Sequence, residues 1–404
     1  MPVLRWSILA IATLPFVYYL TATFCAWDFF RRRREPSADF APPVSILKPL
    51  KGLEREAYEN LASFCRQDYP EYEILFAVDD DRDPAIPIIE RLTHDFPRVP
   101  IRLLVGTTIP GSNNKVAKLC RLQPVARHET LVMSDGDIRV KPDYLRRVVS
   151  PFRDPRVGAV TCLYRGMTDS NLWSELEDLS LTTDWLVSTL VARKFEGVTF
   201  ALGATIAVTR SRLAEMGGFE ALADCAADDY ELGRRIAALG YRVELVSCAI
   251  QTHCASGTPR QFLLHHLRWG VVIRHCRPWG YAGLLFTKGL LWSLAAAMVA
   301  PSRLVAIGYL AIPLAARLAM AFSFGSYGMK DPLLPKRWWL IPFRDALELF
   351  IWVATLFSNS VIWRGSKYYV RRGHLIPATS PAIARHSRAS GNPGLRNGPP
   401  LSQG

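Results

Sequence analysis

The stretch that decides the fold is Thr130-Leu131-Val132-Met133-Ser134-Asp135-Gly136-Asp137, an apolar run followed by two aspartates with a glycine between them. The run predicts a buried strand, and residues two apart in an extended segment point the same way. Two such carboxylates can hold one hard divalent cation, Mg²⁺ or Mn²⁺, together with diphosphate oxygens. We therefore expect Asp135 and Asp137 to be cation ligands at the end of a strand, although a lone D-x-D pattern is common.

Strand-like and helical stretches alternate on both sides of this segment. The expected strands are Val44–Leu47, Ile74–Val78, Ile101–Leu104, Thr130–Met133 and Val157–Thr161. The expected helices are Glu54–Cys65, Ile86–Phe96, Val116–Gln123 and Asp143–Val149. This alternation predicts an α/β domain with a mostly parallel sheet covered by helices. Ligands of such sheets bind beyond the carboxyl ends of the strands.

A second acidic cluster, Asp79-Asp80-Asp81-Arg82-Asp83, follows the predicted strand that ends at Val78. A carboxylate at this place, Asp80 in particular, can accept hydrogen bonds from a nucleobase or a ribose. The alternative is a solvated acidic turn, and the residues by themselves favour it.

A third cluster, Asp228-Asp229, opens a predicted helix about ten residues after Gly217-Gly218-Phe219. The pair could simply cap the helix N-terminus, where the helix dipole stabilises carboxylates. It could equally supply a general base that takes the proton of an attacking acceptor hydroxyl. The residues alone leave both interpretations open.

A fourth cluster lies in the segment 261–269, which contains His265, Arg268 and Trp269. Arg268 could contact a diphosphate and stabilise the charge on a departing nucleotide, and Trp269 could stack on a sugar. The same pattern also fits an amphipathic helix lying at a membrane interface.

Apolar segments flank the α/β region. Ser7–Trp27 is uncharged and long enough to span a bilayer, and the arginines of 31–34 follow it at once, which predicts an uncleaved anchor with the next domain in the cytoplasm. The C-terminal third contains three imperfect apolar segments: Leu284–Ala300, Leu304–Phe324 and Ala346–Trp363. Four crossings would place the basic tail outside, against the positive-inside tendency. We therefore expect one C-terminal segment to be re-entrant or interfacial.

The composition agrees with a folded domain joined to membrane segments. The 404 residues are 50% hydrophobic and carry a net charge of +13, with a mean hydropathy of +0.09, which excludes a disordered or collagen-like chain. None of the eight cysteines forms a C-x-x-C pair, so a structural zinc site is not expected. The positive charge also fits a nucleic-acid-binding membrane protein, but no nucleic-acid module is recognisable.

The four clusters in this order resemble those of inverting nucleotide-sugar glycosyltransferases with the GT-A fold. Further strings are similar to ceramide glucosyltransferases over about residues 44–373: Ser45–Gly52, Gln67–Pro70, Asp83–Ala85, Ile138–Val140 and Trp363–Gly365. Thr161–Gly166, Gly203–Ala207, Gly217–Asp224 and the His-x-x-Arg-Trp form of the fourth cluster are similar to a bacterial branch linked to hopanoid lipids.

The resemblance assigns roles by matching position. Asp80 and Lys115 bind the nucleotide, Asp135 and Asp137 hold the divalent cation and the diphosphate, and Asp229, with Asp228 beside it, is the base. Arg268 and Trp269 belong to the donor site. His265 stands where relatives often have Gln or Arg, so it is an acceptor or auxiliary residue, and His253 is a weaker candidate for the cation.

The resemblance implies an integral membrane enzyme, in a bacterial inner membrane with its catalytic domain in the cytoplasm. It would move glucose or N-acetylglucosamine from a UDP-sugar to the hydroxyl of a hopanoid polyol or a ceramide and form a β-glycoside. The bilayer would be a partner and nucleic acid would not. The expected segments are an anchor (1–30), a basic linker (31–43), the GT-A domain (44–260), an interfacial helix (261–280), membrane segments (281–363) and a basic, largely disordered tail (364–404).

Two rival functions make different predictions. A processive polysaccharide synthase of the same fold would need enough spans for a polymer channel, and this chain offers about four imperfect ones. A catalytically inactive lipid-binding scaffold would release no UDP with any donor.

Overall fold

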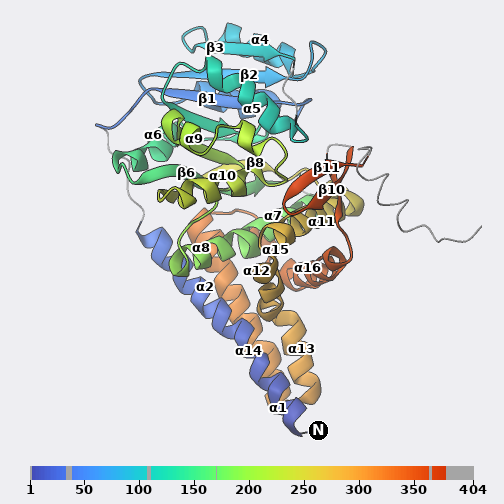
Figure 1. Ribbon diagram of the computed structural model, residues 1–404. Helices are drawn as coiled ribbons and strands as arrows, with labels where there is room; N and C mark the ends of the chain where they lie inside the picture. Colours follow the sequence, from blue (N-terminus) through green and yellow to red (C-terminus); the bar gives the residue numbers. More distant parts are fainter. Residues whose placement is uncertain (1, 33–38, 107–110, 170, 364–365, 379–404) are drawn as a thin grey trace, which may run out of the picture.

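The computed structural model describes residues 2–32, 39–106, 111–169, 171–363 and 366–378. Figure 1 shows an α/β domain above a bundle of long helices, with a small sheet and short helices where the two meet. The predicted disordered tail from Ser380 lies outside the described residues, as do residues 33–38 of the predicted linker.

An eight-stranded sheet in the order β3-β2-β1-β4-β7-β6-β8-β5 forms the centre of the α/β domain. β1 to β4 run parallel to one another, and β6 runs parallel to β8. β7 pairs antiparallel with both β4 and β6, and β5 pairs antiparallel with β8. The mostly parallel sheet is confirmed, and β5, β7 and β8 are additions that the strand prediction omitted. The bounds are β1 Val44–Pro49, β2 Tyr72–Val78, β3 Ile101–Val105, β4 Thr130–Ser134, β5 Ile138–Arg139, β6 Val157–Met167, β7 Thr205–Thr209 and β8 Arg242–His253.

Helices cover both faces because the strands are apolar on both sides. Ile46 of β1 packs in one cluster with Leu61 and Phe64 of α3, while its neighbour Leu47 packs in another with Leu119 of α5. Near-continuous apolar strands are typical of sheets buried on both faces. The helices of this domain are α3 Ala57–Cys65, α4 Ile86–Asp95, α5 Asn114–Val125, α6 Tyr144–Val149, η1 Ser150–Arg153, α9 Arg210–Glu215, η3 Glu220–Leu222 and α10 Asp228–Ala238.

The helical bundle consists of the N-terminal helices and part of the C-terminal third. Two helical stretches of the described residues, Pro2–Arg31 and Arg303–Met329, are long and apolar enough to cross a membrane. A third, Pro278–Val299, qualifies only as a pair of helices bent by 47° at Lys288. The helices are α1 Pro2–Ile11, α2 Leu14–Arg31, α12 Pro278–Gly283, η4 Leu284–Thr287, α13 Gly289–Val299, α14 Arg303–Ala321 and η5 Phe322–Met329.

The prediction that Ala346–Trp363 is one apolar segment near spanning length is wrong. α16 covers Ile341–Leu356, which is 16 residues, and the chain then turns into β9, Ser360–Trp363. The turn is fixed by Arg274, which donates hydrogen bonds to the Ser358 carbonyl at 2.7 Å and to Asn359 Oδ1 at 2.6 Å.

The boundary predicted at residue 363 is also wrong, because the sheet continues past it. β10 Ser366–Arg371 and β11 His374–Pro377 join β9 in an antiparallel sheet. This small sheet also touches the α/β domain, since Ala226 N donates to the Gly373 carbonyl and Leu375 N to the Asp224 carbonyl, both at 2.8 Å. The start of the basic tail therefore supports the loop that leads into α10.

A further set of helices connects the two halves of the molecule. They pack between the sheet and the bundle, where α7, α11, α15 and α16 lie together in Figure 1. Their bounds are α7 Leu172–Ser180, η2 Leu181–Trp185, α8 Leu186–Phe195, α11 Pro259–Cys276, α15 Leu334–Arg337 and η6 Trp338–Leu340.

Candidate active site

The end of β4 brings a lysine and the first aspartate of the D-x-D pattern together. Lys115, in the first turn of α5, places its Nζ 2.6 Å from Asp135 Oδ1 and 3.9 Å from Asp228 Oδ2. It also donates a hydrogen bond to the Gly203 carbonyl at 3.2 Å. The lysine ammonium group therefore brings together three segments that are distant in the sequence. Each of these segments was predicted to carry a functional residue.

The second aspartate of the pattern is held by the neighbouring strand. Ile138 of β5 pairs with Thr252 of β8, and Thr252 Oγ1 donates to Asp137 Oδ2 at 2.8 Å. Burial and, after it, the negative charge of Asp135 raise the pKa of Asp137 to about 6. Two carboxylates that repel each other in this way are suited to share a cation.

The donor set fits a cation site that the substrate completes. Among the residues that the structure describes, no group of three His, Cys, Asp or Glu side chains could hold a metal ion. Mg²⁺ is commonly bound through one or two carboxylates together with substrate phosphates. Asp135 and Asp137 match that pattern, with the remaining positions left for diphosphate oxygens and water.

The two aspartates at the start of α10 contact different neighbours. Asp228 Oδ1 accepts a hydrogen bond of 3.1 Å from Asn113 Nδ2, and Asn113 also caps α5 by accepting from Lys115 N and Val116 N. Asp229 lies against Gly203, where a Cβ built on the glycine would be 2.8 Å from Asp229 Oδ2.

The Asp229 carboxyl has the acidity expected of a general base that works near neutral pH. Burial and the neighbouring Asp228 together raise its pKa to about 6, against the opposing charge of Lys115. A catalytic carboxylate is most effective when its pKa lies near the working pH. Asp229 also serves the start of α10, because its Oδ1 accepts a hydrogen bond from Tyr230 N at 2.8 Å, although the N-cap residue itself is Ala227.

The cluster after β2 is arranged differently from the prediction for Asp80. Asp80 is exposed and accepts a hydrogen bond from Arg82 N at 2.8 Å. Its neighbour Asp79 lies 2.8 Å from Lys118 Nζ and accepts from Asn114 Nδ2 at 3.0 Å. Asp79 therefore contacts the same N-terminal end of α5 that carries Lys115, while Asp80 is accessible from solvent.

α11 carries the fourth cluster, and the side chains of this cluster contact different parts of the structure. Trp269 stacks on Trp185, with ring centroids 5.4 Å apart and planes 7° apart, and His265 meets its edge at 4.4 Å. His265 Nδ1 lies 2.9 Å from Glu177 Oε1. Arg268 faces the small sheet, with its guanidinium 5.8 Å from the centre of the Trp363 ring.

A tyrosine connects this aromatic wall to the carboxylates. Tyr164 of β6 makes a side-chain hydrogen bond with Trp185, and its pKa is raised by burial and by the charges of the site carboxylates, Asp229 first among them. Trp269, Trp185 and Tyr164 therefore form a continuous wall beside the site.

His253 is turned toward another acid. Its Nε2 lies 3.2 Å from Asp169 Oδ1, and Asp169 also pairs with Arg55. The side chain that reaches Asp137 from this strand is its neighbour Thr252, which leaves His253 in a separate ion-pair group.

Comparison with known proteins shows the family of this chain. The model of the family described as "Glycosyl transferase family 21" matches residues 7–376. The chain belongs to this family.

The curated proteins to which the chain is similar include ceramide glucosyltransferases. Ceramide glucosyltransferase 1 of Caenorhabditis elegans is 23% identical over 343 residues, which are 82% of this chain and 72% of that protein. The enzyme of Gibberella zeae is 31% identical over 150 residues, 35% of this chain and 28% of its own length. This family 21 chain is therefore a glycosyltransferase.

A solved structure supports the fold. A mannosyltransferase from Pyrobaculum calidifontis, solved with GDP-Man and Mn²⁺, matches with a TM-score of 0.54 and 20% identity, over 88% of this chain and 99% of its own. At this identity the match establishes the GT-A fold, and the GT-A prediction is confirmed.

The family 21 site also contains a residue that the sequence did not single out. Lys48 of β1 is fully buried; its Nζ donates to the Asp135 carbonyl at 2.5 Å and lies 3.8 Å from the centre of the Phe64 ring. Burial lowers its pKa to about 7, against the attraction of Asp135 and Asp137. A lysine inside an apolar strand is itself a signal, because lysine is almost never fully buried unless paired.

Proposed function

We propose that the chain transfers glucose or N-acetylglucosamine from a UDP-sugar to a hydroxyl of a membrane lipid and inverts the anomeric centre. The observation that carries this proposal is the position of Asp229, a carboxyl with a pKa of about 6 beside the Lys115–Asp135 ion pair. The helical bundle supports a lipid as the acceptor, because two of its helical stretches are long and apolar enough to cross a membrane.

The donor is held by four groups of the chain in this proposal. Asp80 is free to accept from the base or the ribose, and Lys115 supplies positive charge beside the diphosphate. Asp135 and Asp137 would hold the divalent cation, which when bound neutralises negative charge on the diphosphate. Arg268 lies on the same helix as Trp269, and we assign it to the diphosphate as well.

The chemical step is a single displacement. The Asp229 carboxylate takes the proton of the lipid hydroxyl, whose oxygen forms a bond to the anomeric carbon from the face opposite the diphosphate. The bond between that carbon and the diphosphate oxygen breaks, and UDP leaves with the electron pair. An α-linked donor therefore yields a β-glycoside.

The acceptor enters from the side of the helical bundle in this proposal. Trp269 and Trp185 form the wall that it passes, and His265 fixes Trp269 through its edge contact and its pairing with Glu177. The arginines that follow α2 favour a cytoplasmic catalytic domain, so the enzyme would glycosylate lipid from the cytoplasmic leaflet of a bacterial inner membrane.

A matrix of donors and acceptors tests the proposal. Purified full-length enzyme is given UDP-glucose or UDP-N-acetylglucosamine with ceramide or a hopanoid polyol in mixed micelles, in the presence of Mg²⁺ or Mn²⁺. We expect one sugar and one lipid class to give a β-linked monoglycosylated product with release of UDP. Products of many sugars, or no UDP release under any combination, would contradict it.

A further inference from the structure

α16 presents a continuous apolar stripe on the surface of the molecule. The stripe consists of Phe343, Ala346, Phe350, Val353 and Phe357, which follow one another at the three- and four-residue spacing of a single helix face. The four larger side chains are 47%, 63%, 41% and 86% exposed in chain order. The stripe is therefore uncovered in the part of the chain that the structure describes.

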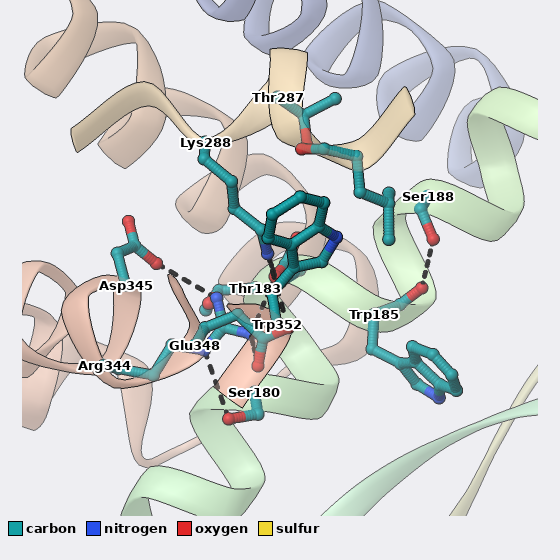
Figure 2. A network of polar contacts seen from close by, with 12 residues as sticks. Ser180, Thr183, Trp185, Ser188, Thr287, Lys288, Arg344, Asp345, Glu348 and Trp352 are labelled. Carbon is teal, nitrogen blue, oxygen red and sulfur yellow. Dashed lines mark hydrogen bonds and ion pairs between the residues drawn. The ribbon is translucent and has the colours of Figure 1, made fainter. Parts of the chain in front are cut away.

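The opposite face of α16 is polar and points into the molecule. Arg344 donates hydrogen bonds to Asp184 Oδ2 at 2.7 Å and to Ser180 Oγ at 3.1 Å. Glu348 Oε1 lies 3.3 Å from Lys288 Nζ, and Figure 2 shows these side chains turned toward one another. A surface helix of a water-soluble protein has the reverse arrangement, with its polar face outward. The outer face of α16 is therefore built for an apolar environment.

Both ends of α16 are fastened to the α/β domain. Ahead of the helix, Arg165 of β6 donates a hydrogen bond to the Lys330 carbonyl. Behind it, the small sheet bonds the loop that leads into α10, through Leu375 N and the Asp224 carbonyl. α16 therefore begins and ends on the same side of any membrane that the bundle crosses. Its 16 residues also extend only about 24 Å, less than the roughly 30 Å of a hydrocarbon core.

Tryptophans mark the level at which α16 lies. Trp338 and Trp339, just ahead of the helix, are 46% and 56% exposed, and Trp279 of α12 is 89% exposed. Lys336 is exposed beside the first two. Tryptophan is enriched at the level of lipid head groups, which lysine side chains near helix ends also reach. Figure 1 shows α15 and α16 next to the α/β domain, while α1, α13 and α14 extend farther from it.

α11 offers no comparable face to a membrane. From Phe262 to Arg277 its side chains are buried or half-buried, because α7, α16 and the small sheet pack around it. Ile351 of α16 lies in one apolar cluster with Phe262, and Leu267 of α11 packs against that cluster. The membrane-facing surface is therefore on α16, and the helix that carries Trp269 lies directly behind it.

We propose that α16 lies in the plane of the membrane and inserts its stripe into the leaflet on the side of the α/β domain. Helices of this kind bury their apolar face about 5–10 Å deep, at the boundary of head groups and acyl chains. A bilayer fits better than another protein chain because α16 packs against α13, whose Leu294 and Met298 are also exposed. The basic segment after α16 then stays on the side of the α/β domain, as the positive-inside tendency favours. This inference goes beyond the proposed reaction and does not depend on it.

Fluorescence at single positions tests the insertion. A nitrobenzoxadiazole dye is attached to Phe343→Cys, Phe350→Cys or Phe357→Cys of the full-length protein in phosphatidylcholine nanodiscs. Because the native cysteines other than Cys276 are buried, the wild-type protein gives the labelling background. We expect blue-shifted emission and equal quenching by acyl-brominated phosphatidylcholine at all three positions, whereas a crossing helix would spread them over about 21 Å of depth. Glu90→Cys, at an exposed position of α4, is the control and should be neither shifted nor quenched.

Accessibility of β10 tests the topology separately. In sealed membrane vesicles, a membrane-impermeant maleimide should label Lys367→Cys, at an exposed position of β10, to the same extent as Glu90→Cys. Permeabilisation should then change the labelling of both alike. Opposite accessibility of the two cysteines or quenching graded from residue 343 to 357 would overturn the inference. So would unshifted, unquenched emission along the whole stripe, which would mean that water or protein covers it. None of these measurements needs turnover, so an enzyme inactive with every donor would refute only the proposed function.

Discussion

Lys115 Nζ lies 2.6 Å from Asp135 Oδ1, so the first aspartate after β4 is paired with a cation of the chain itself. Burial alone would lower the pKa of Lys115, but Asp135 and Asp228 raise it above its ordinary value, so the side chain stays charged. The lysine offsets part of the negative charge that Asp135, Asp228 and Asp229 concentrate here. It is therefore placed to act on donor binding and on the acidity of the base together.

Replacing this lysine should change both properties. In Lys115→Gln we expect affinity for the UDP-sugar to fall about tenfold, the order of one charge-assisted hydrogen bond. Because Lys115 lowers the pKa of Asp229, its loss should also move the acid limb of the pH–rate profile to higher pH. Calorimetric titration and the pH dependence of kcat check the two effects. Lys141→Gln, at an exposed lysine of the same domain, should show neither.

Replacing Asp229 should slow the chemical step. A general base commonly contributes about 10²–10⁴-fold, so Asp229→Asn should lose that much of kcat while it binds UDP-sugar nearly as well as the wild type. The base works only when it is ionised. Wild-type turnover should therefore fall as the pH drops through about 6, the raised pKa of this carboxyl.

Asp228→Asn serves as the comparison for this variant. Its carboxylate is engaged by Asn113, so we expect a smaller loss of kcat and a larger change in donor KM. Near-normal turnover of Asp229→Asn in a single-turnover assay would refute the assignment of the base.

Asp229→Asn should also stabilise the fold. A carboxyl whose pKa rises from 3.8 to about 6 on folding retains its proton in the folded state after the unfolded chain has released its own. Stability is therefore lost as the pH rises through the window from about 4 to 6, and the cost remains above it. Asp229→Asn removes this cost, so we expect a gain on the order of 1 kcal/mol at pH 8. Thermal unfolding at pH 8 and pH 4 checks the sign, and the gain should vanish at pH 4.

The sequence could predict the parts of the site that lie at strand ends. Asp135 and Asp137 were found from an apolar run and a two-residue spacing, because the carboxyl end of a buried strand fixes where such side chains lie. The meeting of Asp135 with Lys115 and Asp228 could not be read from any spacing. It depends on β7, an antiparallel strand that the prediction omitted and whose entry loop carries the Gly203 carbonyl.

The helical bundle shows a different limit of prediction from the sequence. Hydropathy located the apolar stretches around α2 and α14, but it scored α16 and β9 as one segment because both are apolar. Hydropathy also registered Lys288, Arg317 and Glu348 only as interruptions. Lys288 pairs with Glu348, and Arg317 pairs with Asp345, through tertiary packing that no single segment encodes. The polar network in Figure 2 was therefore not predictable.

Gly203 gives the sharpest steric prediction for the base. A Cβ at this position would lie 2.8 Å from Asp229 Oδ2, closer than a carbon and an oxygen can approach without moving. Gly203→Ala should therefore push the carboxylate out of place and lower kcat by about 10²-fold, which is the typical cost of a misplacement of about 1 Å. The KM for UDP-sugar should change less than kcat. Gly308→Ala, where a Cβ meets nothing within 4 Å, is the matched control. A Gly203→Ala enzyme with full kcat would show that Asp229 does not need its observed position, and with it the assignment of the base would fail.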